Sequence, residues 1–264
     1  MALASRTRAT LREYWADRLG VTPTAFTRPG VAVGPANEGG IQLFVGDGWA
    51  VVGAPASLVR TVETRADALD VIEYTVVDGG DGSDADDADH TDHAGDGNAD
   101  AATAVRSWLE SFDAVERVIG PTFYGYADWT AFDPIDSAAR PLEADDEPAY
   151  DALRNAVPDE EWERGGTPLV PGETVGHFVD DELVALAGYA VWDDLLAHIA
   201  VVVHPGHRGD GHGRRVVSRV TELALENGLL AQYRTADAWP WSVDLAEGLG
   251  FERFATASLG IVEE

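Results

Sequence analysis

A turn rich in glycine, histidine and arginine, HPGHRGDGHGRR at 204–215, is the segment best suited to chemistry. It follows an apolar run at 195–203 and precedes a helical apolar pattern at 213–227. The first amide groups of a helix lack internal partners and attract anions. Glycine lets an anion approach them because it has no Cβ. The order of strand, turn and helix therefore predicts a phosphate-binding cradle formed by Gly211 and Gly213, with charge neutralised by Arg208, Arg214 and Arg215.

Two known phosphate-binding motifs do not fit this turn. A P-loop requires Gly-Lys-Ser or Gly-Lys-Thr, and the chain contains no lysine. A dinucleotide-binding fingerprint requires three spaced glycines, and Arg208 stands where the first should be. An ordinary tight turn remains the alternative to a cradle.

Four side chains are candidates for a general base. Glu161 and Glu163 lie in a short helical segment, Asp193 lies in a turn, and His198 lies within the apolar run. An imidazole with an ordinary pKa near 6.5 suits deprotonation of an ammonium group. The alternatives are solvated surface carboxylates and a hydrogen-bonded core histidine.

Three histidines also flank the turn, at 204, 207 and 212. They alternate with proline and glycine, without the i, i+4 spacing of a helical zinc pair. We therefore expect neighbours of a phosphate group and no metal.

Charge is the strongest compositional feature. The 264 residues include 47 acidic and 18 basic residues, every basic one is arginine, and the net charge is −29. Molar salt screens such repulsion because the Debye length falls to about 3 Å. This composition resembles that of cytoplasmic proteins from extreme halophiles. It argues against nucleic acid as a partner, since phosphate contacts need a basic surface and weaken with salt.

The remaining composition narrows the class of protein. Cysteine is absent, which excludes disulfides, thiolate zinc sites and thiol nucleophiles. No apolar run is long enough to span a membrane, and the first twenty residues lack the apolar core of a secretion signal. We expect a cytoplasmic monomer or homodimer that binds no membrane.

The acidic stretch at 78–100 divides the chain. It has too few apolar residues to offset its ordering entropy, so we expect a mobile insertion. Residues 1–119 then form an N-terminal α/β domain, and 120–264 a second domain. The apolar pattern at 104–120 predicts a helix. Hairpins, an apolar central strand and amphipathic helices in the second domain predict an α/β (α+β) fold with a mixed, mostly antiparallel sheet flanked by helices.

The segment from His198 to Gly228 resembles the acetyl-CoA-binding core of the GNAT N-acyltransferases. The shared features are the apolar strand, a Val-x-Pro step and an Arg-x-x-Gly-x-Gly loop that opens a helix. The order of elements resembles that family over about 136–264. Residues 1–119 resemble the degenerate N-terminal half of some two-part members. The resemblance implies acetyl-CoA as co-substrate and a primary amine, on a small molecule or peptide, as acceptor.

The resemblance also implies roles for individual residues. The amide of Val203 would hold the thioester oxygen as it becomes an oxyanion, with His198 or Glu161 as base. The implied cofactor contacts are Val201, Val202, Val203, Arg208, Gly209, Asp210, Gly211, His212, Gly213, Arg214 and Ser242.

The proton donor departs from the family pattern. Many members have an Asn-x-x-Ser/Ala-x-x-x-Tyr frame whose tyrosine protonates the leaving thiolate. Ser242 fits the frame, but Trp239 replaces the asparagine and Ala246 the tyrosine. Water, Ser242 or Tyr233 could substitute.

Three functions follow from these observations. The first is acetyl transfer from acetyl-CoA to a primary amine by direct attack. The second is a GNAT-like module that is catalytically weak or inactive and binds CoA as a regulatory or interaction partner. The third is a protein of another fold that binds a nucleotide phosphate. It applies only if the segment does not fold as a strand, a turn and a helix in that order.

Overall fold

A computed structural model describes residues 2–36, 39–69 and 96–262. By their contacts they form two compact units. The C-terminal unit comprises Tyr124–Thr235 and Trp239–Arg253, with the first residues up to Ala4. The N-terminal unit comprises Ser5–Phe123, Ala236–Ala238 and Phe254–Glu264. None of the helices among the described residues has the length and apolarity needed to cross a bilayer.

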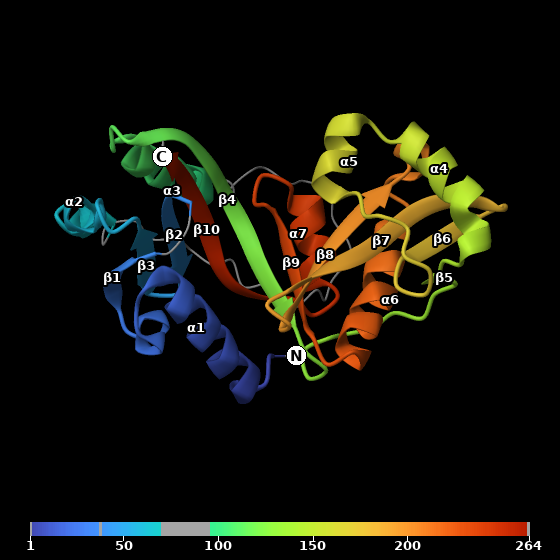
Figure 1. Ribbon diagram of the computed structural model, residues 1–264, viewed down its shortest axis with the longest axis horizontal. Coiled ribbons are helices and arrows are strands. Elements are labelled where there is room, and N and C mark those ends of the chain that lie inside the picture. Colours follow the sequence, from blue (N-terminus) through green and yellow to red (C-terminus); the bar gives the residue numbers. More distant parts are fainter. Residues whose placement is uncertain (1, 37–38, 70–95, 263–264) are drawn as a thin grey trace, which may run out of the picture. The chain divides into compact units, whose positions relative to one another are not determined.

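The C-terminal unit is built on a mixed sheet (Figure 1). Its strands lie in the order β4 (Val115–Ala127), β9 (Leu230–Ala236), β8 (Leu196–Val203), β7 (Glu182–Trp192), β6 (Val175–Val179) and β5 (Arg140–Pro141). Strands β5 to β8 pair antiparallel, whereas β8 and β9 pair parallel.

Turns that contain two successive aspartates close the two hairpins of this sheet. Asp180 and Asp181 join β6 to β7, and Asp193 and Asp194 precede β8. All four aspartates have φ between 48° and 65°, as a hairpin turn with both central residues left-handed requires. Aspartate tolerates this conformation better than most residues.

Helices cover both faces of this sheet. Successive side chains of a strand point to opposite faces. Val202 packs in one cluster with residues of α4 (Glu147–Ala156) and α5 (Asp159–Gly165), which places both helices on its face. On the other face, a Cβ at Gly213 of α6 (His212–Glu226) would lie 3.2 Å from Val203 and 3.4 Å from Leu245 of α7 (Pro240–Glu247). Two short 3₁₀ helices, η3 (Ala144–Asp146) and η4 (Pro205–His207), precede α4 and α6.

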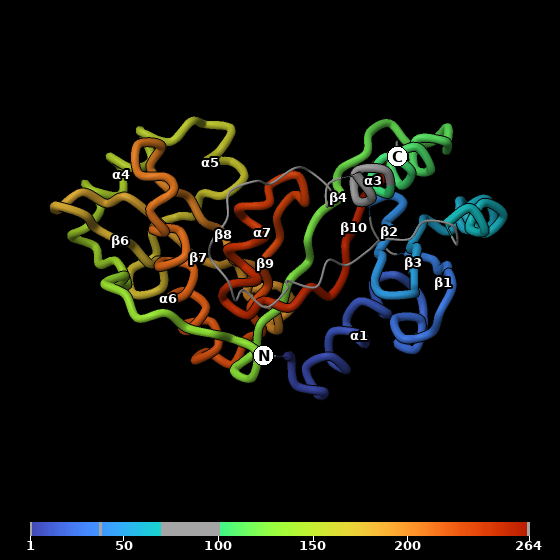
Figure 2. The backbone as a smooth tube through the Cα atoms, turned by 180° about the vertical axis from the view of Figure 1, so that it is seen from behind, coloured from blue at the N-terminus to red at the C-terminus, as the bar shows by residue number. Residues whose placement is uncertain are grey.

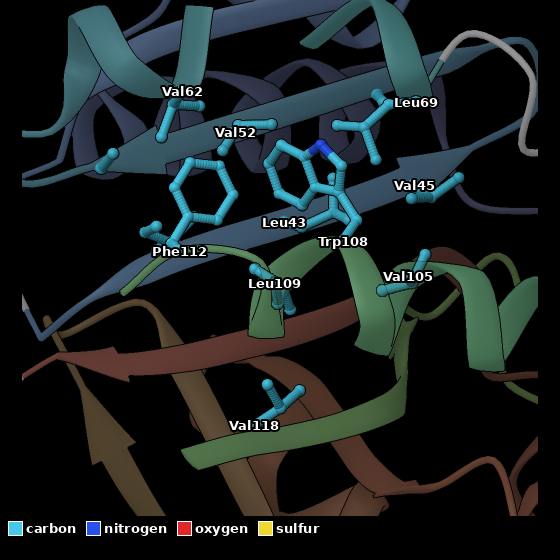
Figure 3. Close-up of a cluster of buried hydrophobic side chains, with 13 residues drawn as sticks. Leu43, Val45, Val52, Val62, Leu69, Val105, Trp108, Leu109, Phe112 and Val118 are labelled. Carbon is cyan, nitrogen blue, oxygen red and sulfur yellow. The ribbon is translucent and has the colours of Figure 1, made fainter. Parts of the chain in front are cut away.

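The N-terminal unit has further strands and a core of its own. Strands β1 (Gly30–Pro35), β3 (Trp49–Ala54), β2 (Ile41–Gly46), β10 (Glu252–Val262) and β4 lie in that order. The helices are α1 (Ser5–Leu19), η1 (Pro23–Phe26), α2 (Val59–Glu63), η2 (Ala66–Leu69) and α3 (Asp96–Glu110). Figure 2 shows these elements from behind. Trp108 and Phe112 lie 4.9 Å apart between ring centroids and pack in an apolar cluster with Leu43 and Val52 (Figure 3).

The predicted fold class, a mixed α/β sheet flanked by helices, is confirmed. The predicted helix at 104–120 is wrong beyond Glu110, where α3 ends; the chain turns near Phe112 and enters β4 at Val115. The β-branched residues Val115, Val118 and Ile119 favour this strand.

Two predicted boundaries differ from those of the described residues. Of the expected insertion at 78–100, residues 78–95 lie outside the described residues, and 96–100 begin α3. The two units also divide the chain differently from the predicted boundary at 119/120, because Phe254–Glu264 joins the N-terminal unit.

Candidate active site

The parallel pair β8 and β9 opens along its length. Leu196 pairs with Leu230, Ala197 with Ala231 and His198 with Gln232, and their ladder ends there. Beyond His198, β8 stays paired with β7 up to the match of Val203 with Ala185. Leu196 and Ala197 are fully buried, whereas Ala200, Val201 and Val203 are partly exposed. The sheet therefore separates at the carboxyl end of β8.

Main-chain groups of β8 face this opening. The amide of His204 donates to the carbonyl of Val184 on β7. Since the N–H and C=O groups of a strand alternate in direction, those of Val202 also face β7. The groups of Val201 and Val203 face the other way, toward the side on which β9 has diverged. Val202 differs from its two neighbours, because its main-chain groups face β7 and its side chain packs in the core.

The turn before α6 has the form of an anion cradle. Gly209 and Gly211 have φ of 91° and 74°, which other residues rarely adopt. Gly211 is the N-cap of α6 and has no side chain to cap it. The first amide bonded within the helix is that of Arg215, which donates to Gly211 O at 3.3 Å. Among the described residues the amides of His212, Gly213 and Arg214 have no acceptor, so three donors stand at the positive helix end.

Gly213 has a different role from Gly211. It is buried, and the Cβ of any larger residue there would press against Val203 and Leu245. At Gly211 an added Cβ would meet only Nη1 of Arg215, at 3.5 Å. Gly211 therefore keeps space open at the helix end, whereas Gly213 lets α6 pack closely on β8.

Three arginines surround the cradle, each with a partner. Arg208 forms an ion pair with Glu161 of α5. Arg214 donates to the carbonyl of Gly248, and Arg215 to that of Asp210 at 2.7 Å. The predicted cofactor arginine Arg208 and the predicted base Glu161 are thus brought together. Both side chains are more than 40 % exposed, so their attraction is largely screened.

Glu182, His204 and His207 form the group of potential metal ligands in the described part of the chain, with ligand atoms within 4.8 Å of one another. Nδ1 of His204 accepts the amide of Gly206 at 3.0 Å. The proton of the neutral ring therefore lies on Nε2, the nitrogen that faces Glu182 at 3.8 Å. A metal needs a lone pair at that nitrogen, whereas this tautomer directs an N–H group toward the carboxylate of Glu182.

His198 belongs to a hydrogen-bonded chain on the α4/α5 face. Gln232, fully buried, donates through Nε2 to the hydroxyl of Tyr126 at 2.6 Å. Its Oε1 lies 3.0 Å from Nδ1 of His198 and accepts from it. The imidazole also stacks on Trp192, with ring centroids 4.3 Å apart. Burial, helped by the positive charge of Arg234, lowers the pKa of His198 to about 4. The tautomer leaves a lone pair on Nε2, but it is weakly basic.

A tyrosine of β9 contacts α7, the helix that lacks the tyrosine of the family frame. Ala246 of α7 is fully buried. The hydroxyl of Tyr233, on β9 just after the paired segment, lies 3.1 Å from Oγ of Ser242 on α7. Burial raises the pKa of Tyr233, and the bond to Ser242 lowers it by less. The phenol therefore keeps its proton at neutral pH.

Sequence reasoning missed Tyr126, Gln232 and Arg234 as site residues. Gln232 and Arg234 alternate with apolar residues in LLAQYRT, a pattern that predicts only a strand. Two polar residues on one face of an interior strand were the available signal, since a buried polar group needs a partner.

Residues 129–251, a little under half of the chain, match the model of the Acetyltransferase (GNAT) family. No curated protein matches the sequence.

Several solved structures are similar to this chain. A GNAT-family protein from Novosphingobium aromaticivorans is 24% identical over 56% of this chain and 67% of its own, with a TM-score of 0.43. A GNAT acetyltransferase from Colwellia psychrerythraea is 17% identical over 57% of this chain and 59% of its own, with a TM-score of 0.44.

A Salmonella typhimurium protein, yncA, whose structure contains acetyl-CoA, is 16% identical over 49% of this chain and 96% of its own, with a TM-score of 0.36. The first two alignments thus span about two thirds and three fifths of those chains. All three TM-scores are below 0.5, so the roles proposed below rest on the chain's own residues.

Proposed function

We propose that the C-terminal unit transfers an acetyl group from acetyl-CoA to a primary amine. The observation that carries this proposal is the opening between β8 and β9 beside the uncapped amino end of α6. A long, thin thioester with a diphosphate at its middle needs both features, a slot in the sheet and a row of amide donors. The family match over 129–251 supports the proposal.

The residues of the turn fit the diphosphate of the co-substrate. The amides of His212, Gly213 and Arg214 point along the helix axis toward it, and the helix dipole adds to their attraction. Gly209, Asp210 and Gly211 supply a backbone that can approach the oxygens closely. Arg208 and Arg214 would exchange their present partners, Glu161 and the carbonyl of Gly248, for phosphate oxygens.

The main chain of β8 supplies the polar groups for the thioester. The amide of Val203 would donate to the acetyl oxygen as the amine attacks, and Val201 would contact the amide-rich arm of the co-substrate. In this reaction the amine nitrogen bonds to the acetyl carbon and releases a proton, the carbon–sulfur bond breaks, and the thiolate takes up a proton. Removing one such oxyanion donor costs on the order of 10²–10³ in rate in other enzymes. Val202 stays a predicted contact.

We assign the proton for the thiolate to Tyr233, positioned by Ser242. The phenol occupies the α7 side of β9, where the strand has left β8, and it is protonated at neutral pH. A tyrosine on the strand would thereby replace the absent tyrosine of the helix at Ala246.

A base role for His198 or Glu161 stays a prediction. Because its pKa is about 4, His198 is a weak base for the ammonium proton of the acceptor. It is better suited to orienting groups on the α4/α5 face. Glu161 is engaged with Arg208 and would act as a positioning residue for the cradle. Four expectations from the sequence stay predictions: dependence on salt, a cytoplasmic location, a monomer or homodimer, and a degenerate N-terminal half.

The second candidate is a module that binds CoA without turnover, favoured by Trp239 and Ala246 in the frame of the last helix. One experiment separates the two. Thermal shift with acetyl-CoA in molar potassium chloride measures binding, and thiol release over a panel of amines measures transfer. Binding with thiol release supports the enzyme. Saturable binding without thiol release on any amine would establish the module instead, and the absence of binding would refute both.

A further inference from the structure

Arg234 of β9 is held between two aromatic rings. Its guanidinium carbon lies 4.2 Å from the ring centroid of Tyr124 and 5.6 Å from that of Trp192. The side chain is half-buried, and its nitrogens are not among the buried atoms that lack a partner. Ring contacts of this kind fix the position of a guanidinium while leaving its edge donors free.

The other arginines of the C-terminal unit have oxygen partners. Six form ion pairs with carboxylates: Arg140, Arg154, Arg164, Arg208, Arg219 and Arg253. Arg214 and Arg215 donate to main-chain carbonyls. Arg234 has neither kind of partner among the residues that the structure describes. In a chain with 47 acidic residues, a fixed cation without a carboxylate needs an explanation.

The position of Arg234 links it to the opening. It follows Gln232 by two residues, so the two share a face, and Gln232 is the last residue paired with β8. That face also carries His198 and Trp192, and it is the one covered by α4 and α5. The cradle lies at the end of α6, on the opposite face. A thioester held from the α6 side through the opening would therefore present its acetyl group to the face that carries Arg234.

We propose that Arg234 binds a carboxylate of the acceptor, so that the substrates are amines that also carry a carboxylate group. This inference rests on the proposed acetyl transfer. The planar fork of a guanidinium binds the two oxygens of a carboxylate with two parallel hydrogen bonds. A fixed cation beside the opening, without a carboxylate partner among the described residues, would select acceptors that carry a carboxylate.

The test compares amines that differ only in a carboxylate: ethylamine with alanine, 2-phenylethylamine with phenylalanine, and 1,5-diaminopentane with lysine. Thiol release with saturating acetyl-CoA gives kcat/KM for each member in the same molar salt. For the full chain we expect at least one carboxylate-bearing member to react about tenfold faster than its partner or more, and Arg234→Gln to abolish that preference. The reaction of the carboxylate-free member should change by less than about twofold.

Two further variants separate recognition from folding. Arg234→Lys keeps the charge without the fork, so it should restore part of the preference. Arg219→Gln removes the same charge from the outer side of α6, where Arg219 pairs with Glu222 at 2.8 Å, and it should leave the preference unchanged. The thermal shift produced by acetyl-CoA shows that each variant is folded and binds the donor.

The outcomes are distinct. Transfer without preference for the carboxylate, or equal losses on both members in Arg234→Gln, would overturn the inference while leaving acetyl transfer intact. Thiol release with no amine of any class would refute the proposed function, and the inference would fall with it.

Discussion

The carboxylate of Glu161 on α5 and the guanidinium of Arg208 in the turn before α6 form an ion pair. It joins a segment beside the carboxyl end of β8 to the proposed diphosphate cradle. Gly165, at the end of the same helix, lies so close to β8 that a Cβ there would be 2.5 Å from the carbonyl oxygen of Val201.

Replacing Glu161 with glutamine tests whether it positions Arg208 or takes a proton. A positioning role predicts a change of KM for acetyl-CoA of less than about tenfold, an unchanged pH profile and nearly unchanged kcat. Arg208→Gln should raise the same KM in the same range. Stability should change by less than about 1 kcal/mol in both variants, since the pair is exposed. A large loss of kcat in Glu161→Gln, with KM unaltered, would instead identify a general base.

Gly211 and Gly228 provide a matched pair at the two ends of α6. Both have positive φ, 74° and 77°, and at neither would an added Cβ have a main-chain atom of another segment within 4 Å. Alanine at either site should destabilise the fold by a similar amount, about 1–2 kcal/mol. Only Gly211→Ala should weaken acetyl-CoA binding, which calorimetric titration in molar salt measures. Equal affinity of the two variants would contradict the cradle.

Tyr233→Phe should lower kcat by about tenfold or more, since a positioned general acid contributes 10²–10⁴ in other enzymes and thiolate is a tolerable leaving group. KM for acetyl-CoA should change little. The matched variant Ser242→Ala removes the 3.1 Å bond but keeps the phenol, so its loss of kcat should be smaller. An unaltered kcat in Tyr233→Phe across the pH range would show that water supplies the proton.

His198 makes stability depend on pH in a defined window. The unfolded chain takes up a proton near pH 6.5, whereas the folded chain excludes it until about pH 4. The unfolding free energy should therefore fall as the pH is lowered from 6.5 to about 4. His198→Phe removes this dependence, although it leaves Oε1 of Gln232 without a donor and should cost about 1–3 kcal/mol at neutral pH. Denaturant unfolding of both proteins at pH 7, 5.5 and 4.5 measures the difference, and parallel pH curves would show that His198 titrates normally.

The charge of −29 predicts that salt stabilises the folded state. At about 1 M salt the Debye length is near 3 Å, so repulsion between carboxylates is screened. The melting temperature should rise steeply between 0.1 and about 2 M potassium chloride. A neutral osmolyte of equal osmolality is the control, because it does not screen charge. Equal stabilisation by both solutes would assign the effect to osmolality instead.

The sequence alone determined the local features of the C-terminal unit. Helical periodicity at 213–227 predicted α6, and the apolar run at 195–203 became β8. These are properties of neighbours along the chain, where side-chain spacing and backbone preference suffice. The same local reasoning extended α3 too far, because an apolar segment such as Val115–Ile119 fits a helix or a strand until its partners are known.

Only the tertiary structure decided which of these features form one site. The site depends on contacts between residues that lie 34 to 106 positions apart in the sequence. They are the bonds of Gln232 to His198 and to Tyr126 and the ion pair of Arg208 with Glu161. The point where β8 and β9 separate likewise depends on distant residues. The separate use of Gly211 and Gly213 likewise depends on what α6 packs against. Such contacts depend on strand register and helix docking, which follow from packing of the whole core and leave no periodic mark in the sequence.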